Sequence, residues 1–444
     1  MKRYIMILLS LLIVMTAGAE DVLTLDQCKE LALQNNVAIR NASLQSGIAK
    51  AMRQEAFTKY FPNVSATGAA FTTNNSVVKY KFDDNIQLPA IPDILPEGGA
   101  FPINLDFSLI KKGVMADVNL VQPVFMGGLI VNGNKLAEIG EVVAELQSRQ
   151  SEDQVILTVE QYYWQLASLK SKRKTVDDLI AMLDTLERQV TVAVNAGVTL
   201  RNDLLEVQLR RNEMLTGRVE LDNGITIVST ILAQYIGKGI EPIGISADIT
   251  PAMTVNKPDT LFVLPSDALY STTDYGLLQQ NVEASKIQEK MSLGANLPKV
   301  AVGAGYFYHN IIDQGHGFGA IYATVSIPIS DWWGGSHSMR QSKLKVEMAR
   351  NDLSNYSELL QVKMSNAWNA LNTSYEKIGI ARQSIEQANE NLKLNENYYR
   401  AGTIAITDLL KAQTLFQQSH NQFVDAYGDY QIKTIEYLQS TGRK

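Results

Sequence analysis

Two short segments that lie far apart in the chain are nearly alike, and together they restrict the fold more than any other feature. In the first, Ala196-Gly197 is followed after five residues by Asp203-Leu204-Leu205. In the second, Ala401-Gly402 is followed at the same spacing by Asp408-Leu409-Leu410. A glycine that ends one helix, with Thr, Asn or Asp at the start of the next, is typical of antiparallel helices joined by a short turn. The sequence therefore predicts two helical hairpins that turn at these tips.

Long apolar repeats precede both tips. Over 128–195 and 336–401, apolar residues recur at seven-residue spacing, namely Tyr162, Leu169, Val176, Leu183 and Val190 in the first segment and Met364, Leu371, Ile378, Ile385, Leu392 and Tyr399 in the second. An apolar period of 3.5 residues predicts helices that supercoil around neighbouring helices. At 1.5 Å per residue, each segment would form a helix of roughly 100 Å. Shorter helices are expected after the tips, over 202–236 and 407–440.

Alternating polarity predicts strands before each long helix. We expect β-hairpins over 61–124 and 298–329, each preceded by a helix, the first of which covers 26–58. Apolar residues alternate with polar ones in both hairpins, at Val114, Ala116, Val118 and Leu120 and again at Ile321, Ala323 and Val325. Such alternation is typical of a strand with one apolar and one polar face. The Pro-rich insertion between Leu88 and Gly99 is expected to be an exposed loop.

The order of helix, β-hairpin, long helix, tip and helix occurs twice, so the sequence predicts a tandem internal repeat. The first repeat is expected over 20–237 and the second over 266–444, with a linker over 238–265. Residues 1–19 combine a basic start, an apolar run and the small residues Ala17-Gly18-Ala19. This composition predicts a secretory signal peptide that is cleaved from the mature chain.

Charge and cysteine content narrow the class of protein. The chain of 444 residues has a formal net charge of −6, and it becomes more acidic when Lys2 and Arg3 leave with the signal peptide. An acidic chain argues against a nucleic-acid partner. Because Cys28 is the only cysteine, an intramolecular disulfide is excluded, and we expect this residue to lie in a helix.

Hydropathy limits how the chain could cross a membrane. Beyond the signal peptide no run of eighteen apolar residues occurs, so strands rather than helices would have to cross, which points to an outer membrane. Two hairpins supply only four strands, and each unpaired backbone group at an open sheet edge would cost several kcal/mol in lipid. Several chains would therefore have to combine their strands into one closed barrel. The number of chains does not follow from the residues alone.

The duplicated order of elements, the strand starts at Phe61-Pro62 and Leu297-Pro298, and both tips resemble the TolC family of outer-membrane efflux channels over about 24–440. The resemblance implies a mainly α fold with a membrane β-barrel. It implies a homotrimer whose twelve-stranded barrel in the cell outer membrane continues as a long α-helical coiled-coil barrel through the periplasm. It also implies that 238–265 forms an equatorial segment, and that the tips form the entrance. An inner-membrane transporter of undetermined type would reach this entrance through a periplasmic adaptor protein.

The resemblance also implies a narrow, cation-sensitive entrance that is lined by acidic residues just after each turn. By position these residues are Asp203 and Glu206 in the first repeat. In the second repeat they are Asp408 and Lys411, so a lysine stands where other members carry an aspartate. A carboxylate in the first turn of a helix is also favoured by the helix dipole, by roughly 0.3–1 kcal/mol. Stabilisation by the helix dipole is a purely structural explanation for Asp203 and Asp408. It is compatible with a role of the same carboxylates in lining the entrance.

The turns themselves are the expected adaptor-docking surface. The residues concerned are Gly197, Val198, Thr199, Gly402, Thr403 and Ile404. Both glycines are also expected to end their helices for reasons of backbone geometry. An arginine that latches the entrance in the family would fall at Ile404, and Arg201 in the other repeat is the candidate replacement.

Few other residues suggest a site. Tyr60 and Phe61 before the first strand, with Trp332 and Trp333 after the last, are expected to form an interfacial aromatic belt, although a packed turn is an alternative for the two tryptophans. The histidines show no spacing that suits a metal site and are expected to be solvated in loops; they are His309, His316, His337 and His420. No cofactor is expected.

The function predicted from these features is a passive channel that performs no reaction. It would export small molecules or proteins, as part of a tripartite efflux or type I secretion system, when docked to an energised pump. The alternative is a periplasmic coiled-coil adaptor or scaffold protein without a membrane barrel. Strand polarity separates the two hypotheses, because an adaptor would bury the apolar face of its strands in a domain core.

Overall fold

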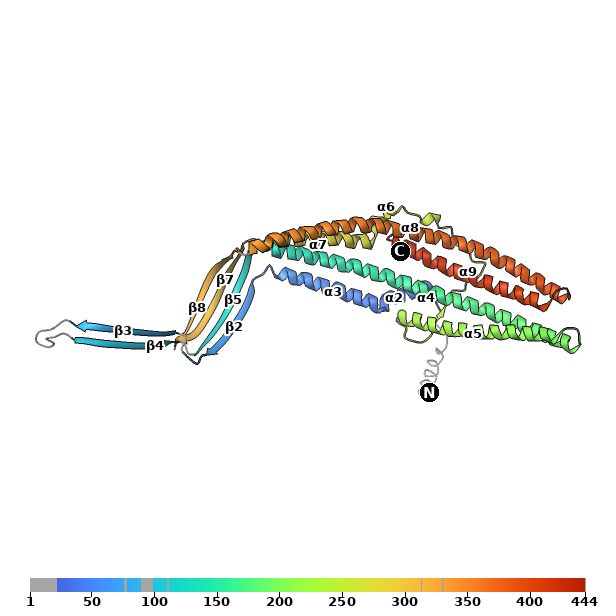
Figure 1. Ribbon diagram of the computed structural model, residues 1–444, viewed down its shortest axis with the longest axis horizontal. Coiled ribbons are helices and arrows are strands. Elements are labelled where there is room, and N and C mark those ends of the chain that lie inside the picture. Colours follow the sequence, from blue (N-terminus) through green and yellow to red (C-terminus); the bar gives the residue numbers. More distant parts are fainter. Residues whose placement is uncertain are drawn as a thin grey trace, which may run out of the picture. The chain divides into compact units, whose positions relative to one another are not determined.

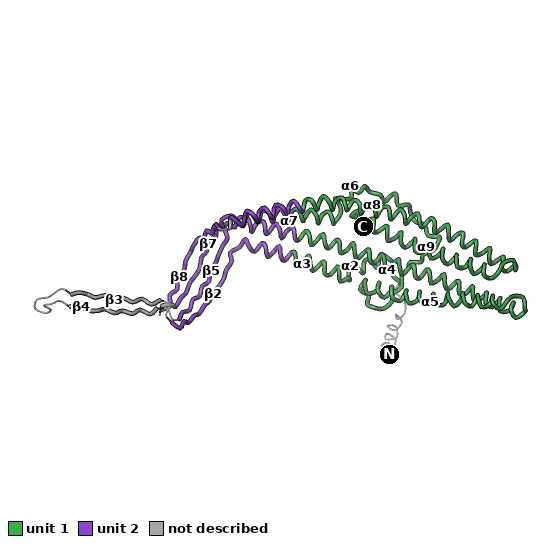
Figure 2. Tube along the Cα trace, viewed as in Figure 1, with its two compact units in different colours: residues 1–49, 141–282, 349–444 green, residues 50–140, 283–348 purple. Residues whose placement is uncertain are grey.

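The computed structural model describes residues 22–75, 78–88, 99–109, 112–312, 314–329 and 331–443. The predicted signal peptide over 1–19 and the predicted loop over 89–98 lie outside the described residues. The chain divides into two compact units, coloured separately in Figure 2. One unit comprises Met1–Ala49, Glu141–Val282 and Ala349–Lys444, and the other comprises Lys50–Gly140 and Glu283–Met348. Each unit is described by itself below.

Helices make up most of the described chain (Figure 1). They are α2 (Leu25–Asn35), α3 (Val37–Thr58), α4 (Leu129–Asn195), α5 (Arg201–Tyr235), α6 (Pro265–Ala268), α7 (Thr273–Ala295), α8 (Asp331–Arg400) and α9 (Ile406–Ser440), with short 3₁₀ turns at Pro258–Leu261 and Leu269–Ser271. A long helix, a tip and a shorter helix follow one another twice, as α4–α5 and as α8–α9. The tandem repeat predicted from the sequence is therefore present. Within the described ranges, no helix is both long enough and apolar enough to cross a membrane.

The prediction of one continuous helix over 26–58 was wrong, because the chain breaks at Asn36. This residue has an extended backbone (φ −64°, ψ 138°) and ends α2. Its side-chain oxygen accepts a hydrogen bond from the Ala38 N–H at 2.8 Å, and its side-chain nitrogen donates to the Tyr235 carbonyl at 2.9 Å. Asparagine favours such local bonds to the backbone over a helix interior. The break therefore fixes the α2–α3 junction to the end of α5.

Heptad positions of the long helices form the core of the helical unit. Fully or almost fully buried examples are Leu183, Val190, Met364, Leu371 and Ile378. One apolar cluster joins α2, α4, α5, α8, α9 and the linker, and a second joins α4, α5, α8 and α9 nearer the tips. Cys28 lies in α2, as its position predicted, and is completely buried in the first cluster. Its burial raises the pKa of the thiol to about 11.

The linker over 238–265 is fastened to the helical unit. Its strand β6 (Gly244–Ile245) pairs in parallel with β1 (Val22–Leu23) near the start of the described chain. Further along, the Ile249 carbonyl accepts a hydrogen bond from the Ser171 hydroxyl of α4 at 2.9 Å. The Asn256 carbonyl accepts one from the Tyr430 hydroxyl of α9 at 2.7 Å. The linker therefore lies against helices of both repeats.

Four antiparallel strands form one sheet in the other unit (Figure 1). They are β2 (Asn63–Thr72), β5 (Lys112–Met126), β7 (Lys299–Ile312) and β8 (Gln314–Ser326), in the order β2-β5-β7-β8. Pairing of β5 with β7 runs from Val114↔Asn310 to Met126↔Lys299, so the strands of the two repeats join into a single sheet. The strands β2 and β8 are the two edges of this sheet.

The two faces of the sheet differ sharply in polarity. One face carries large apolar side chains that are all exposed in a single chain: Val64, Val114, Val118, Leu120, Val302, Tyr306, Tyr308, Ile321 and Val325. The other carries Asn63, Ser65, Thr67, Asp117, Asn119, Tyr322 and Thr324, with Met115, Phe307, His309, His316 and Phe318 at one end of the sheet. On this polar face the Tyr322 hydroxyl donates to the Asn119 side-chain oxygen at 2.7 Å. The period-two alternation of the sequence is thus realised on all four strands.

The insertion between β2 and β5 contains strands that the sequence analysis did not predict. Strand β3 (Val78–Leu88) pairs with β4 (Gly99–Leu109) in an antiparallel ribbon of two strands. Pro102 lies within β4, opposite Asn85. Proline lacks an N–H, but each strand of a two-stranded ribbon has one edge that needs no partner, so proline is tolerated there. The Pro-rich sequence of the insertion therefore concealed the β3–β4 hairpin from the sequence-based prediction.

Candidate functional site at the helical tips

The turn between α4 and α5 has a geometry that requires glycine. Gly197 has a φ of 69°, in the left-handed region. The Val198 N–H donates to the Ala193 carbonyl at 2.9 Å, and the Gly197 N–H donates to the Val194 carbonyl at 3.0 Å. These two bonds form a Schellman motif, which satisfies carbonyl groups at the end of α4.

The turn between α8 and α9 repeats this geometry. Gly402 has a φ of 73°. The Thr403 N–H donates to the Tyr398 carbonyl at 3.0 Å, and the Gly402 N–H donates to the Tyr399 carbonyl at 2.9 Å. No other group lies within 4 Å of the position that a Cβ atom would occupy at either glycine. The glycines are therefore required by the backbone conformation and not by crowding.

The helices that follow the turns begin without side-chain caps. Leu200 precedes α5 and Ala405 precedes α9, and neither side chain can accept a hydrogen bond. The Asp203 and Asp408 carboxylates lie in the first turns of these helices, where the positive end of the helix dipole favours them. The structural explanation for both aspartates therefore applies.

The two aspartates have different partners. Asp203 is half-buried, and its carboxylate accepts a short hydrogen bond from the Thr199 hydroxyl of the turn. Asp408 is exposed, and its carboxylate lies 3.8 Å from the Lys411 ammonium. In the second turn the threonine acts differently, because the Thr403 hydroxyl donates to the Tyr398 carbonyl. Among the described residues, the Asp203 carboxylate therefore has a hydroxyl partner and no ion pair, whereas the Asp408 carboxylate lies beside a positive charge.

Glu206 and Lys411 line the same groove. Glu206 accepts a hydrogen bond from the Asn202 side chain at 2.9 Å. The groove between α5 and α9 has a volume of about 630 Å³ and is lined by Glu206, Leu209, Arg210, Glu213, Thr407, Leu410, Lys411, Thr414 and Leu415. Its apolar lining residues are Leu209, Leu410 and Leu415. Arg210 of α5 donates a hydrogen bond to the Gln417 side chain of α9 at 3.0 Å. The groove thus combines an exposed leucine surface with charges of both signs.

Tyr399 connects the two tips, which the sequence analysis missed. It occupies the last heptad position of α8 and packs against the apolar cluster near the tips. Burial and the negative charge of Asp203 both raise the pKa of the Tyr399 hydroxyl, so the two side chains lie near one another. The only sequence signal was an aromatic residue with a polar end at the last position of an otherwise aliphatic series.

The two candidate latch positions, Ile404 and Arg201, form no ion pair within the described part of the chain. Ile404 is half-buried and cannot form an ion pair. Arg201 is exposed, and it forms no ion pair with the residues that the structure describes. Val198 at the first tip is 79% exposed, and Thr403 at the second is also exposed. The tip turns therefore present a small, open surface.

Ion pairs and hydrogen bonds join the helices behind the tips. Arg218 of α5 lies 3.1 Å from the Asp177 carboxylate of α4, and the Arg211 guanidinium pairs with Asp184. Lys172 of α4 lies 2.6 Å from Asp425 of α9. These bonds tie α4 to its hairpin partner and to the second repeat.

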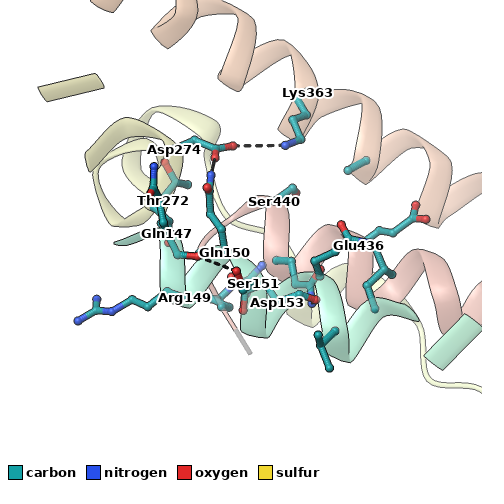
Figure 3. Close-up of a pocket in the computed structure, with 18 of the residues that line it drawn as sticks. Gln147, Arg149, Gln150, Ser151, Asp153, Thr272, Asp274, Lys363, Glu436 and Ser440 are labelled. Atoms are coloured by element: carbon teal, nitrogen blue, oxygen red, sulfur yellow. Dashed lines mark hydrogen bonds and ion pairs between the residues drawn. The ribbon is translucent and has the colours of Figure 1, made fainter. Parts of the chain in front are cut away.

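A larger cavity of about 890 Å³ lies between α4, the start of α7, α8 and the end of α9 (Figure 3). On its wall the Gln150 side chain donates to the Asp274 carboxylate at 2.5 Å, and Lys363 lies 3.4 Å from the same carboxylate. These bonds link α4, α7 and α8. The three bonded side chains, Gln150, Asp274 and Lys363, do not form a pair of nucleophile and general base, so they do not indicate a catalytic site.

None of the four histidines lies in a loop, so the expectation of loop positions was wrong, although His337 lies near the start of a helix as the sequence predicts. His309 and His316 lie in β7 and β8, and His337 lies in α8. His420 of α9 is only 9% exposed, and its ring nitrogens lie 3.0 and 3.1 Å from the Thr175 hydroxyl of α4. It follows Gln413, also buried, at heptad spacing, so the core seam of α9 contains polar residues.

The aromatic residues at the strand ends are partly described. Tyr60 and Phe61 are 40% and 55% exposed, and both rings contact Phe57 edge-to-face. Helix α8 begins at Asp331, before the predicted start at 336, so Trp332 and Trp333 belong to its first turn. Trp333 is 82% exposed, which excludes a packed turn for this residue. The side chain of Trp332 lies outside the described residues.

Comparison with known proteins supports one fold for the whole chain. Residues 264–443 match the family model described as "Outer membrane efflux protein". The outer membrane efflux protein BepC of Brucella suis biovar 1 (strain 1330) is 25% identical over 285 residues, which is 63% of this chain. The match spans 60% of the length of that relative.

Solved structures match over almost the full chain. The outer membrane protein VceC of Vibrio cholerae matches with a TM-score of 0.72 and 14% identity, covering 94% of this chain and 96% of that chain. CusC matches with a TM-score of 0.74 and 12% identity over 97% and 96%. The CmeC outer membrane channel of Campylobacter jejuni matches with a TM-score of 0.73 and 14% identity over 94% and 85%. These matches confirm the predicted resemblance and fold class.

The tip geometry predicts opposite effects for two Gly→Ala substitutions. Gly402→Ala forces an L-residue into the left-handed region and should lower the free energy of unfolding by about 1 kcal/mol. Gly217→Ala, within α5 and also free of neighbours within 4 Å, should raise it by about 0.5–1 kcal/mol. Thermal unfolding followed by circular dichroism measures both. Equal shifts of the same sign would contradict the assigned backbone conformation.

The environment of His420 predicts a dependence on pH. Burial lowers the pKa of His420, the Asp178 charge opposes this shift, and Lys172 and Lys174 add to it. The folded state thus prefers the neutral ring, so its contribution to stability is present above the ordinary pKa of about 6.5 and is lost as the pH falls below that value. Between pH 7.5 and 5.5 the thermal midpoint should fall further in the natural protein than in His420→Gln. Parallel pH profiles would contradict this prediction.

Proposed function

We propose that this chain, an outer membrane efflux protein with the TolC fold, is the passive exit duct of a multi-component export system. Three copies would combine their strands into one barrel in the outer membrane and their helices into one tunnel through the periplasm. The observation that carries the proposal is the four-stranded sheet, which has two edge strands and one continuous apolar face that is exposed in a single chain.

The apolar face is best explained by contact with lipid. Ile321 is 90% exposed, and Val64 and Val325 are about two-thirds exposed on the same face. Large exposed apolar surfaces mark sites of contact with a membrane or a protein. The opposite face carries Asp117 and Asn119, which suit a water-filled lumen. A periplasmic adaptor or scaffold would instead bury such a face in its own core.

Closure of the barrel follows from the edges. In lipid each unpaired backbone N–H or C=O costs several kcal/mol, so β2 and β8 need partners. Pairing β2 of one copy with β8 of the next satisfies both edges and closes the sheet. Four strands from each of three copies give a barrel of ordinary size for an outer-membrane protein.

We assign the entrance of the duct to the tips. Three copies of Asp203, fixed by Thr199, would give a ring of negative charge at a narrow mouth. Asp408 contributes less, because Lys411 lies beside it. Tyr399, near the end of α8, packs against the apolar cluster that also contains residues of α4 and α5.

The groove between α5 and α9 is the proposed contact for a periplasmic adaptor. Leu209 and Leu415 are 64% and 51% exposed there, between Glu206 and Lys411. A partner helix with apolar residues and charges of both signs would fit such a surface. The adaptor would connect the duct to an inner-membrane transporter, which supplies the energy. Small molecules or proteins would then pass through the wet lumen.

Lysine scanning of the sheet tests the proposal. Ile321→Lys places a charge on the proposed lipid face, which costs about 2–4 kcal/mol at the middle of a bilayer, so the yield of membrane-extracted trimer should fall strongly. Thr324→Lys, on the polar face, should leave the yield nearly unchanged. The trimer is measured by light scattering after detergent extraction of outer membranes. A soluble monomer, or equal yields for both variants, would refute the duct and favour the scaffold hypothesis.

Charge substitutions at the tips test the entrance. Asp203→Ala should weaken block of single-channel current by multivalent cations more than Asp408→Ala, since only the first carboxylate is uncompensated. Lys411→Gln should strengthen the block, because it frees Asp408. Planar-bilayer recordings with the cation added to the periplasmic side measure these effects. If Asp203→Ala leaves the block unchanged, this carboxylate does not line the entrance.

A further inference from the structure

Two histidines face one another across β7 and β8. His309 and His316 are direct partners in the antiparallel register. Their ring centroids lie 6.1 Å apart, with an angle of 43° between the ring planes. The register of β7 and β8 brings the two residues together.

A third donor side chain lies in the same row of the sheet. Met115 of β5 is the direct partner of His309. Since directly opposed residues share a face, Met115, His309 and His316 occupy one face at one level of three neighbouring strands. Met115 is 41% exposed, so its thioether is accessible.

One ring nitrogen of this row lacks a hydrogen-bond partner in the described protein. The Nδ1 atom of His309 is shielded from solvent and has no hydrogen-bond partner among the described residues. The His309 ring contacts the Phe318 ring edge-to-face at 6.5 Å, and Phe318 stacks on Phe307 at 5.5 Å. The histidine pair is therefore flanked on one side by an aromatic wall. A buried nitrogen without a partner is costly unless a ligand occupies it.

The ring separation suits a shared metal ion. A metal at 2.0–2.1 Å from one nitrogen of each imidazole places the ring centres roughly 5–6.5 Å apart. The observed 6.1 Å falls in this range. No group of three or more His, Cys, Asp and Glu residues in the described part of the chain could hold a metal, so this row is a different kind of donor set.

We propose that His309 and His316, with Met115 beside them, bind a copper ion. Imidazole nitrogen binds copper, nickel and zinc, and copper has the highest affinity among the divalent ions for such ligands. A thioether adds affinity for the softer Cu⁺ and its analogue Ag⁺, but little for zinc or nickel. The combination of two imidazoles with one thioether therefore selects copper.

The row lies on the polar face of the sheet. Asp117 follows Met115 by one side-chain repeat on β5, and Phe307 lies opposite Asp117 on β7. If the polar face lines the lumen, each protomer would contribute one copper site to the wall of the duct. Only this placement rests on the proposed function; the site itself is formed within one chain.

Copper titration of the full-length protein tests the site. The protein is purified in detergent through a tag without histidine and is titrated with Cu²⁺. We expect one copper per chain after desalting, with an electron paramagnetic resonance spectrum that reports two imidazole nitrogens. His309→Gln and His316→Gln should each weaken binding at least about tenfold. His337→Gln, an exposed histidine of α8, is the matched control and should bind as the natural protein does.

The outcomes separate a site from adventitious binding. Unchanged affinity in His309→Gln, or an equal loss in His337→Gln, would overturn the proposal. Met115→Leu should weaken Ag⁺ binding while it leaves Zn²⁺ and Ni²⁺ binding unchanged. An Ag⁺ affinity that does not respond to Met115→Leu would overturn the selection of copper.

A recording of single-channel current tests separately whether the copper site lies in the lumen of the channel. Cu²⁺ added to the extracellular side should alter the current of the natural protein and not that of His316→Gln. Copper binding in solution without any effect on current would place the row outside the lumen and would leave the metal site intact. If neither the natural protein nor His316→Gln conducts current even without copper, the result would count against the proposed channel function.

Discussion

The pairing of β5 with β7 is the interaction on which the rest of the structure depends. These strands belong to different repeats, and their hydrogen bonds join two hairpins into one sheet with only two edges. Without this ladder each hairpin would be an isolated pair of strands, which is marginally stable in water. The same ladder sets the faces of all four strands, because a shift by one residue would exchange the apolar and polar sides. The exposed apolar face and the alignment of Met115 with His309 both depend on this register, and the β7–β8 register adds His316 to the row.

The helical unit is stabilised in two ways that differ between the repeats. Heptad residues such as Val190 and Leu371 bury an apolar seam along all four long helices. Ion pairs such as Arg218 with Asp177 join α4 to α5 within the first repeat. The described side-chain bonds of α9 to other helices instead run to the first repeat, for example from His420 to Thr175 of α4 and from Gln417 to Arg210 of α5. Polar contacts therefore hold the second repeat to the first at the level of His420. Closer to the tips, Tyr399 packs against the apolar cluster that contains residues of both repeats.

Local sequence patterns predicted much of this fold. The seven-residue repeats and the two Ala-Gly tips depend on neighbours a few residues away, so the sequence reveals them directly. The break at Asn36 was missed because its cause, a bond to the Tyr235 carbonyl, lies in a distant helix. The packing of Tyr399 against residues of α4 and α5 was missed for the same reason. The functional assignment of the tips came from the resemblance.

The burial of Cys28 has a practical consequence. The thiol is the only one in the chain, it is completely enclosed, and its raised pKa of about 11 keeps it protonated near neutral pH. It is therefore inert toward maleimides and toward disulfide-forming enzymes in an oxidising compartment. A cysteine introduced at an exposed position would be the sole reactive thiol of the molecule. The natural protein is thus a ready background for site-directed labelling, with no need to remove a native cysteine first.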